Sequence, residues 1–302
     1  MKKVLVVGSL NMDFAVYMDR RPQAGETVMA QSMKLVPGGK GANQAYALGK
    51  LGARTAMIGA VGTDTFGEQM LANLESVSVD TAGVKKITGA ETGKAFIEID
   101  SSGQNSISVI AGANAAVDET LVQGQEKLFA KADAVVMQLE IPVPSVLAAA
   151  KLAKKHGKLV VLDPAPARAD LPDELWAHVD ITKPNETELA LLTGLPTGTA
   201  DEAVTAAKFL LSKGVKNVLV TLGGEGTLLV GAGQVERIPA YQVKAVDTTA
   251  AGDCFLAAFV SYFTGSNFAE AIDFGAKAAS IAVTRKGAQT SIPTKEEVEK
   301  FC

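Results

Sequence analysis

The sequence contains few residues of the kinds that build metal centres and disulfide frameworks. Among 302 residues there are two cysteines, Cys254 and Cys302, two histidines and one tryptophan, and aromatic residues make up 5% of the chain. Two cysteines cannot form a framework of several disulfides. Together with only two histidines, they argue against a zinc site built on thiolates or imidazoles.

Basic charge is not in excess either. The chain carries 29 lysines and arginines against 33 aspartates and glutamates, which gives a net charge of −4. A non-specific nucleic-acid binder normally presents a basic face, so we expect no nucleic-acid partner. An anionic substrate is still compatible with this balance, because a site can be locally positive on an acidic protein.

Long apolar runs are missing as well. No run reaches the roughly 20 residues that a membrane-spanning helix needs. The first apolar run, 4–7, ends at Gly8 and is followed by the polar residues Asn11 and Asp13. This pattern is typical of a buried strand and not of a secretory leader. We therefore expect a soluble, cytoplasmic protein without a membrane partner.

What the chain does contain is an alternation of two patterns, short β-branched runs and alanine-rich stretches. The apolar runs predict strands at 3–8, 55–61, 134–138, 159–163, 180–183 and 217–222. The alanine-rich stretches predict helices at 41–51, 64–74, 119–130, 143–156, 200–212, 252–263 and 268–284. Strands that are apolar throughout are typical of a parallel sheet covered by helices on both faces, so the pattern predicts a doubly wound α/β domain.

Two segments interrupt this alternation. Shorter strands are predicted at 14–19 and 33–36 with no helix between them, and 94–100 and 105–110 are predicted to form a hairpin joined by Ser-Ser-Gly-Gln. We interpret these strands as a small antiparallel sheet inserted into one domain that spans 1–302. The inserted segments are approximately 12–37 and 92–111, and such a sheet suits a lid over a ligand.

Two glycine clusters stand at predicted turns. Gly-Gly-Lys-Gly-Ala-Asn-Gln at 38–44 precedes a helix, where free backbone amides can face an oxygen-rich ligand. Gly41 directly after the lysine excludes a Walker A loop, which needs serine or threonine there. Thr-Leu-Gly-Gly-Glu-Gly at 221–226 follows an apolar strand and precedes strand-like residues. It is either a plain turn between strands or a loop that passes over a nucleotide.

The third cluster, Asp-Thr-Thr-Ala-Ala-Gly-Asp at 247–253, is the most informative. Small residues at the start of a helix expose several N–H groups, and the helix dipole adds partial positive charge. Such a nest suits a phosphoryl group that gathers negative charge during transfer. Asp253 stands where its carboxylate could reach a hydroxyl presented to the nest. The alternative is a carboxylate that merely complements the helix dipole.

Taken together and in this order, the motifs resemble those of the ribokinases within the phosphofructokinase-B superfamily of carbohydrate and nucleoside kinases. The resemblance covers nearly the whole chain. It rests on Gly-Ser-Leu-Asn-Met-Asp at 8–13, the cluster at 38–45, Lys-Pro-Asn-Glu-Thr-Glu at 183–188 and the cluster at 247–253, with support from 137–140 and 284–289. It implies a ribokinase-like three-layer α/β/α domain with a mostly parallel sheet. It also implies an inserted β-sheet lid that pairs with a second copy to form a homodimer.

The reaction that the resemblance implies is ATP-dependent phosphorylation of the 5-hydroxyl of D-ribose to ribose 5-phosphate. Asp253 would be the general base, and Ala250, Ala251, Gly252 and Asp253 would supply the amides of an anion hole. The matching sugar-binding positions are Asn11, Met12, Asp13, Gly39, Lys40, Gly41, Ala42, Asn43, Glu140 and Asp253.

The resemblance also implies Mg²⁺ and a monovalent cation, usually K⁺, beside ATP. Glu188, with Asn185, matches the pair that positions Mg²⁺ and phosphate through water, although helix capping is an alternative role for both. The nucleotide positions are Asn185, Thr221, Leu222, Gly223, Gly224, Glu225, Gly226, Gly252 and Asp253, with Lys277 on the adenine side. The cation positions are Asp247, Thr249, Ala282, Arg285, Gly287 and Ser291, mostly through backbone carbonyls.

Several alternatives stay open at this stage. Lys277 stands where the family often has a short polar residue or histidine, so it is equally compatible with a solvated helix lysine. Cys254 is either a reactive thiol or a small buried residue. The substrate could instead be deoxyribose, a nucleoside or another small sugar. From other classes, a nicotinamide-dependent oxidoreductase would need Gly-x-Gly-x-x-Gly after the first strand, and a sugar-sensing module would leave Asp253 without a purpose.

Overall fold

The fold is built on a large twisted sheet. The structure, a computed structural model, describes residues 1–301, and within them nine strands form this sheet in the order β13-β12-β11-β10-β9-β8-β1-β4-β5. In chain order the strands are β1 (Lys3–Val7), β4 (Arg54–Gly62), β5 (Asp80–Ile87), β8 (Ala134–Met137), β9 (Leu159–Leu162), β10 (Ile181–Thr182), β11 (Asn217–Thr221), β12 (Thr227–Gly231) and β13 (Gln234–Ile238). All pairs from β5 to β11 are parallel, and the β11–β12 and β12–β13 pairs are antiparallel. The expected mostly parallel sheet is confirmed.

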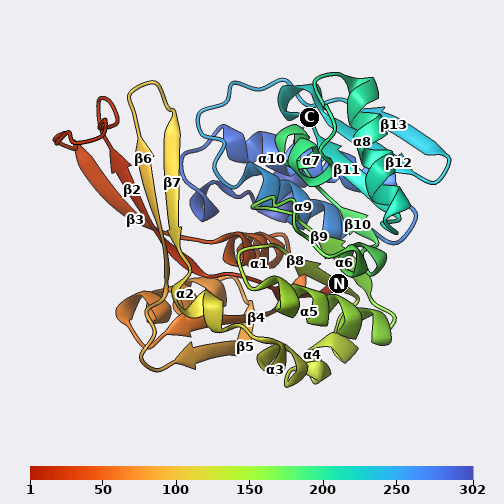
Figure 1. Ribbon diagram of the computed structural model, residues 1–302, viewed down its shortest axis with the longest axis horizontal. Helices are drawn as coiled ribbons and strands as arrows, with labels where there is room; N and C mark the ends of the chain where they lie inside the picture. The colour runs from red at the N-terminus through yellow and green to blue at the C-terminus, as the bar shows by residue number, and fades with distance from the viewer. Residues whose placement is uncertain (302) are drawn as a thin grey trace.

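Helices cover both faces of this sheet (Figure 1). Successive strand residues point to opposite faces, so Val4 and Val6 of β1 enter one apolar core, and Leu5 and Val7 enter the other. The first core is closed by α1 (Lys40–Lys50), α2 (Thr65–Glu75), α9 (Ala251–Tyr262), α10 (Phe268–Val283) and α11 (Lys295–Glu299). The second is closed by α3 (Glu119–Gln123), α4 (Glu126–Lys131), α5 (Val143–Lys155), α6 (Asp173–Ala177), α7 (Glu186–Thr193) and α8 (Ala200–Ser212). The three-layer α/β/α architecture follows from these two cores.

A second sheet projects from the side of this body (Figure 1). Its four strands follow the order β3-β2-β6-β7 and are β2 (Asn11–Tyr17), β3 (Ser32–Gly38), β6 (Gly93–Ile99) and β7 (Asn105–Ile110). The β6–β7 hairpin is present as expected. The expectation of a wholly antiparallel sheet is wrong, because β2 pairs with β6 in parallel across residues 11–17 and 93–99. The chain passes through α1, β4, α2 and β5 between these two strands, and it re-enters the small sheet in the same direction.

The structure also differs from the prediction at one helix and at strands that the sequence patterns did not indicate, among them β5 and β13. The single helix expected at 119–130 is divided into α3 and α4, because Gly124 and Gln125 leave the helix between them. Glycine has a low helix propensity, which makes this the weakest point of the run. Strand β5 was not expected, since it is an edge strand with mostly exposed or half-buried residues and lacks a continuous apolar run.

The parallel strands place their carboxyl ends along one edge of the large sheet. Residues that follow β1, β8, β9, β10 and β11 therefore meet on one side, which is where open α/β sheets bind their ligands. None of the helices within residues 1–301 is long and apolar enough to cross a membrane.

Candidate active site

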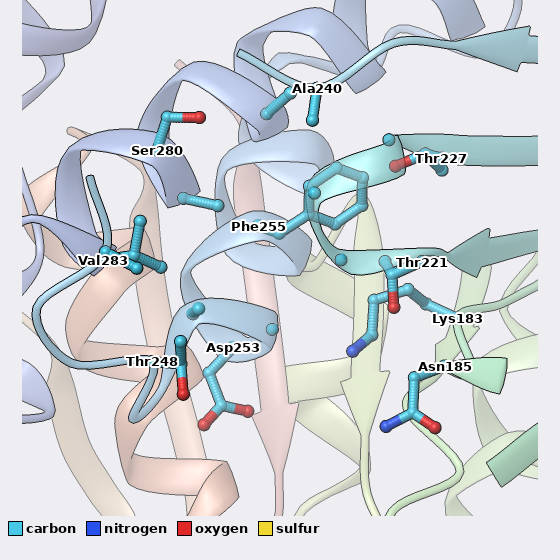
Figure 2. A pocket seen from close by; sticks show the side chains of 18 of the residues that line it. Lys183, Asn185, Thr221, Thr227, Ala240, Thr248, Asp253, Phe255, Ser280 and Val283 are labelled. Carbon is cyan, nitrogen blue, oxygen red and sulfur yellow. The ribbon is translucent and has the colours of Figure 1, made fainter. Parts of the chain in front are cut away.

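A cavity of about 650 Å³ opens at the carboxyl ends of β9, β10 and β11 and is closed on the other side by α9 and α10. In Figure 2, Asp253, Lys183 and Asn185 lie at one end of this cavity, and Ala240 and Ser280 lie at the other. The predicted site residues that line it are Lys40, Asn185, Glu188, Thr221, Gly223, Gly224, Gly226, Ala250, Ala251, Gly252 and Asp253. The structure thus brings residues of four separate sequence motifs to one cavity.

The start of α9 forms the floor of this cavity. Ala250 precedes the helix in the left-handed conformation, with φ of 59°, and no side chain caps the helix there. Among the described residues only one other non-glycine residue, Ser78, has a positive φ. The Ala251 amide donates to the Thr248 carbonyl at 3.2 Å, and the next amides of α9, those of Gly252 and Asp253, are available to an anion because the first turn of a helix offers them no acceptor. Strain of this kind concentrates at functional sites.

Asp253 lies in the first turn of α9 and is buried. Its carboxylate accepts hydrogen bonds from two side chains of α1. Asn43 Nδ2 donates to Oδ2 at 3.0 Å, and Gln44 Nε2 donates to Oδ1 at 2.9 Å. The glycine cluster at 38–44 therefore does more than form a turn, since its helix holds the carboxylate of the third cluster.

Burial and the neighbouring charged groups shift the pKa of Asp253 in opposing directions. Burial is the largest cause and raises the pKa of Asp253, and the nearby Asp163 adds to this rise, whereas Lys40 and the two amide donors lower it. Burial alone lowers the pKa of Lys40, but the carboxylates of Asp253, Asp163 and Glu140 outweigh it and raise the pKa. The result is a base whose basicity exceeds that of a solvated aspartate, beside a permanently charged lysine.

The residues expected to bind the sugar gather beside the cavity, on the side of the small sheet. Asn11 begins β2, and its Oδ1 accepts a hydrogen bond of 2.8 Å from Nδ2 of Asn114. Glu140 accepts hydrogen bonds from the Ser9 hydroxyl and from the backbone amide of Lys40 at 2.9 Å. Asn11, Met12, Asp13 and Asn43 are buried and do not line the large cavity. Asp253 connects these residues to the cavity, because it lines the cavity and also accepts a hydrogen bond from Asn43.

Asp13 is the most unusual of these residues. It is buried on β2, and its Oδ1 has no hydrogen-bond partner. Burial, followed by the charges of Glu140 and Asp253, raises the pKa of Asp13 from 3.8 to about 7. The neighbouring Gly38 is required, because a Cβ there would lie 2.0 Å from Asp13 Oδ2. A buried acceptor without a donor suits a hydroxyl-bearing ligand.

Asn185 and Glu188 form a capping box at the start of α7. The amide of Glu188 donates to Asn185 Oδ1, and the amide of Asn185 donates to Glu188 Oε2, both at 2.8 Å. The capping alternative is thus confirmed, and both residues also line the cavity. Beside them, Lys183 forms a buried ion pair of 3.3 Å with Asp163.

The loop at 221–226 connects β11 to the antiparallel β12, as the plain-turn interpretation expects, and it also lines the cavity. Leu222 is buried beneath it, and Glu225 pairs with Arg237 at 2.6 Å. Lys277 is outside the set of cavity-lining residues. Its ammonium lies 3.1 Å from Asp273 Oδ2, and the Tyr241 hydroxyl, from the cavity wall, donates to the other oxygen of Asp273.

The expected cation positions converge next to the start of α9. Asp247 accepts hydrogen bonds from the amide and hydroxyl of Thr249 and from the amide of Gly287 at 2.8 Å. Burial alone raises the pKa of Asp247, but these hydrogen bonds outweigh it and lower the pKa. Its carboxylate therefore ties the loop before α9 to the turn after α10.

The other cation positions lie on this turn or next to it. The carbonyl of Ala282 accepts a hydrogen bond from the backbone amide of Arg285. The Arg285 guanidinium forms an ion pair of 2.7 Å with Glu297. The Ser291 hydroxyl donates a hydrogen bond to the carbonyl of Ala288.

Comparison with known proteins identifies the family. Residues 1–295 match the pfkB family of carbohydrate kinases. The chain belongs to this family. It is 44% identical to a ribokinase of Staphylococcus aureus over 301 residues, which is 99% of each chain. It is also 38% identical to a deoxyribokinase of Salmonella typhi, over 99% of this chain and 98% of the relative.

A solved structure agrees with this assignment. The Arabidopsis thaliana ribokinase complexed with ribose and ATP matches all of this chain and 99% of its own, with a TM-score of 0.93 and 37% identity. The expected ribokinase-like fold is confirmed, and this pfkB-family protein is an ATP-dependent carbohydrate kinase. The oxidoreductase and sugar-sensing alternatives are thereby set aside.

Several residues of this pfkB-family site were absent from the sequence-based site. Gln44, Asp163 and Lys183 surround Asp253, Asn114 holds Asn11, and Gln289 donates to Asn43 at 3.0 Å. Asp163 and Lys183 are the last residues of the strands predicted at 159–163 and 180–183, so strand ends were a usable signal for them. Asn114 and Gln289 lie in short 3-10 helices, at Gly112–Ala116 and Gln289–Ser291, away from any predicted strand end. Gln289 belongs to the stretch 284–289 that supports the resemblance, but no role was assigned to it.

Cys254 lies on α9, directly after Asp253, and is fully buried in the apolar core that α9 shares with α10. Burial, followed by the charge of Asp253, raises the pKa of its thiol to about 12. A thiol that stays protonated at neutral pH is a poor nucleophile, which favours the small buried residue over the reactive thiol. Cys302 lies outside the described residues.

Replacing Asp13 by asparagine tests whether the buried Asp13 carboxyl has a raised pKa in the folded protein. Because the folded protein binds the Asp13 proton more tightly than the unfolded chain does, the stability gained from protonation is present below pH 4 and is lost as pH rises toward 7. We expect Asp13→Asn to remove this loss and raise the free energy of unfolding at pH 8, by up to about 4 kcal/mol.

Urea unfolding at pH 4.5 and pH 8 measures the difference, with Asp201→Asn on the exposed face of α8 as the control. An equal change from pH 4.5 to pH 8 in wild type and Asp13→Asn would contradict the assignment.

Proposed function

We propose that this kinase transfers the γ-phosphoryl group of ATP to the 5-hydroxyl of D-ribose, with Asp253 as general base. The observation that carries the proposal is the position of the buried Asp253 carboxylate. It stands at the start of α9, where the nucleotide-sized cavity meets the polar residues of the sugar side. The S. aureus relative is a ribokinase, and the Arabidopsis protein is complexed with ribose and ATP, which supports the same substrates for this chain.

In this proposal the sugar oxygen attacks the γ-phosphorus while Asp253 accepts the hydroxyl proton. The bond between the γ-phosphorus and the oxygen that bridges to the β-phosphorus breaks, and ADP leaves with that electron pair. Negative charge that develops on the transferring group meets the amides of residues 250–253. Lys40, which also lines this end of the cavity, is charged and adjacent. Alignment and charge neutralisation of this kind account for most of the catalysis in phosphoryl transfer.

The sugar would be held by Asn11, Asp13, Asn43 and Glu140, with backbone contacts from the loop at 38–42. These side chains offer acceptors and donors to several hydroxyls at once, and Asp13 Oδ1 needs a donor. A substrate that lacks a bonded hydroxyl leaves such a buried group unpaired, which disfavours it. Deoxyribose is the second candidate, because the Salmonella typhi relative is a deoxyribokinase.

Asn185 and Glu188 fit a Mg²⁺ ion that reaches the protein mostly through water. Within residues 1–301 no group of three or more histidine, cysteine or carboxylate side chains could hold a metal by itself. Mg²⁺ commonly keeps several waters and binds one or two carboxylates together with substrate phosphates, so one glutamate at the cavity wall is sufficient. When bound, the ion would neutralise phosphate charge. Glu188 is fixed for this purpose by its hydrogen bond to the Asn185 amide.

The loop 247–249 and the turn after α10 fit a monovalent cation. Hard, weakly hydrated cations prefer oxygen ligands, and this region offers an ionised carboxylate at Asp247 and the carbonyls of a tight turn. The ligands in this proposal are Asp247, Thr249, Ala282, Arg285, Gly287 and Ser291, mostly through their carbonyls, because the Arg285 side chain is turned toward Glu297. When bound, K⁺ would add positive charge behind the anion hole.

The small sheet would act as a lid on the sugar and as the contact between two copies of the chain. Its strands expose large apolar side chains at Met33, Leu35, Phe96, Ile107 and Val109. By the strand register, Met33, Leu35 and Phe96 share one face of the sheet, and Ile107 and Val109 share the other. Exposed apolar side chains on a small sheet are typical of a surface that another molecule covers. In the proposal, 1–302 is one domain with lid segments near 12–37 and 92–111.

Substrate preference distinguishes the two sugars. We expect kcat/KM for D-ribose to exceed that for 2-deoxy-D-ribose by about 10-fold or more, because one unpaired buried polar group costs about 1–3 kcal/mol. Coupled ADP release over ribose, deoxyribose, fructose, adenosine and fructose 6-phosphate measures this directly. Equal or greater kcat/KM for deoxyribose would assign the chain to the second candidate.

The role of Asp253 is tested by Asp253→Asn, which preserves size and can still hydrogen-bond within the site. We expect kcat to fall by about 10²–10⁴-fold while ribose and ADP binding are retained, since general-base catalysis contributes on this scale. Steady-state kinetics and calorimetric titration separate the two effects, with Asp201→Asn as the matched control. Turnover near the wild-type rate would remove Asp253 from the base role.

Potassium activation is tested by exchanging salts. At matched ionic strength we expect a higher rate in KCl than in NaCl, and a smaller difference in Asp247→Asn because its loop loses an ionised acceptor. Identical rates in both salts for the wild-type enzyme would contradict a selective potassium site.

A further inference from the structure

Gln44 makes an unusual set of contacts for a helix residue. It lies on α1 with no solvent exposure, and its Nε2 donates to two carboxylates at once, 2.9 Å from Asp253 Oδ1 and 2.8 Å from Asp163 Oδ2. These carboxylates come from different parts of the chain, one from α9 and the other from the residue after β9. A single primary amide therefore connects both sides of the candidate site.

The orientation of the Gln44 side chain is fixed from the other end. Its Oε1 accepts a hydrogen bond of 2.6 Å from Gln138 Nε2, so the amide nitrogen must face the carboxylates. Gln138 is itself fully buried, and its Oε1 occupies the space that a Cβ on residue 8 would fill, so Gly8 is needed for this arrangement. The segment that follows β8 thus sets the direction of the donor on α1.

Asp163 connects Gln44 to Lys183, which lines the large cavity. Its Oδ1 has no hydrogen bond and faces Lys183 Nζ at 3.3 Å. Lys183 Nζ in turn lies 3.1 Å from the place of a Cβ on Gly252, at the start of α9 (Figure 2). The Lys183 ammonium therefore lies beside the first residues of α9, and its positive charge is paired with the Asp163 carboxylate.

We propose that Gln44 is a positioning residue for phosphoryl transfer, which fixes the Asp253 carboxylate toward the sugar hydroxyl and links it to the Asp163–Lys183 ion pair. The inference rests on the proposed role of Asp253 as general base. Asn43 holds only Oδ2 of that carboxylate, so without Gln44 the group can rotate about its Cβ–Cγ bond.

The loss of Gln44 changes ionisation as well as orientation. The charged groups around Asp253 are Lys40 on α1, Asp163 after β9, Lys183 after β10 and Asp13 on β2. A donor that bonds to an ionised carboxylate favours the ionised form, so its removal raises the pKa of the base. It also leaves two buried carboxylates facing each other without a shared donor.

Gln44→Met tests the proposal, because methionine has nearly the same length and no donor. We expect ribose and ADP affinities within about threefold of wild type and kcat reduced about 30-fold or more, since small misplacements of a reacting group have effects of this size. We also expect the acidic limb of the kcat/KM profile to move to higher pH by about half a unit or more.

Ser145→Ala is the matched control. It removes one buried hydrogen bond, to the Val117 carbonyl at 2.6 Å, on α5 and away from the cavity. We expect it to leave kcat and the pH profile unchanged. If Gln44→Met does not fold, Gln44→Asn keeps the amide but withdraws it from the carboxylates, and the same shift in the acidic limb is expected.

An unmoved acidic limb, or kcat within threefold of wild type in the folded variant, overturns the positioning role. This failure is distinguishable from failure of the proposed function. If Asp253→Asn is inactive and Gln44→Met is normal, only the Gln44 inference fails. If Asp253→Asn is active, the base assignment itself fails.

Discussion

The candidate site depends on a buried carboxylate, which in the proposed mechanism must also accept a proton. Asp253 is out of contact with bulk water, and burial makes its ionised form expensive unless donors and positive charges compensate. Two amides from α1, the charge of Lys40 and the start of α9 supply this compensation. They come from elements that lie more than 200 residues apart in the chain, so the complete α/β/α packing is needed to hold one acidic group.

This constraint explains the position of the first glycine cluster. Helix α1 must approach the strand ends closely, because Asn43 and Gln44 reach Asp253 with short side chains. A Cβ at Gly41 would lie 2.5 Å from the backbone nitrogen of Ser9, and Gly39 has a φ of +84° with the Asn11 nitrogen 2.7 Å from the place of its Cβ. Glycine is needed at both positions, for close contact and for the left-handed backbone. The same cluster thus contacts Glu140, an expected sugar residue, and holds the carboxylate of Asp253, the proposed base.

The sequence patterns predicted the large sheet well, because its strands are buried on both faces and appear as continuous apolar runs. They failed for β5 and for the parallel β2–β6 pair, where burial is partial and the partner strand lies about 80 residues away. For the site, motifs located Asp253, Asn43 and the capping box of Asn185. They could not show that Gln44 joins Asp163 to Asp253, since that contact exists only after α1 and β9 pack together.

Three acidic residues lie close together near β2, and this arrangement lowers the stability of the folded protein while it suits the proposed sugar binding. After burial, the charges of Glu140 and Asp253 raise the pKa of Asp13, and Asp13 Oδ1 has no hydrogen-bond partner among the described residues. A folded protein gains nothing from this arrangement in isolation, because charging Asp13 near neutral pH lowers the free energy of unfolding. A ligand that presents hydroxyl donors would satisfy the unpaired oxygen and relieve part of that loss. The proposed sugar contact therefore accounts for the unpaired oxygen better than folding does, just as a bound anion would account for the start of α9, which no side chain caps.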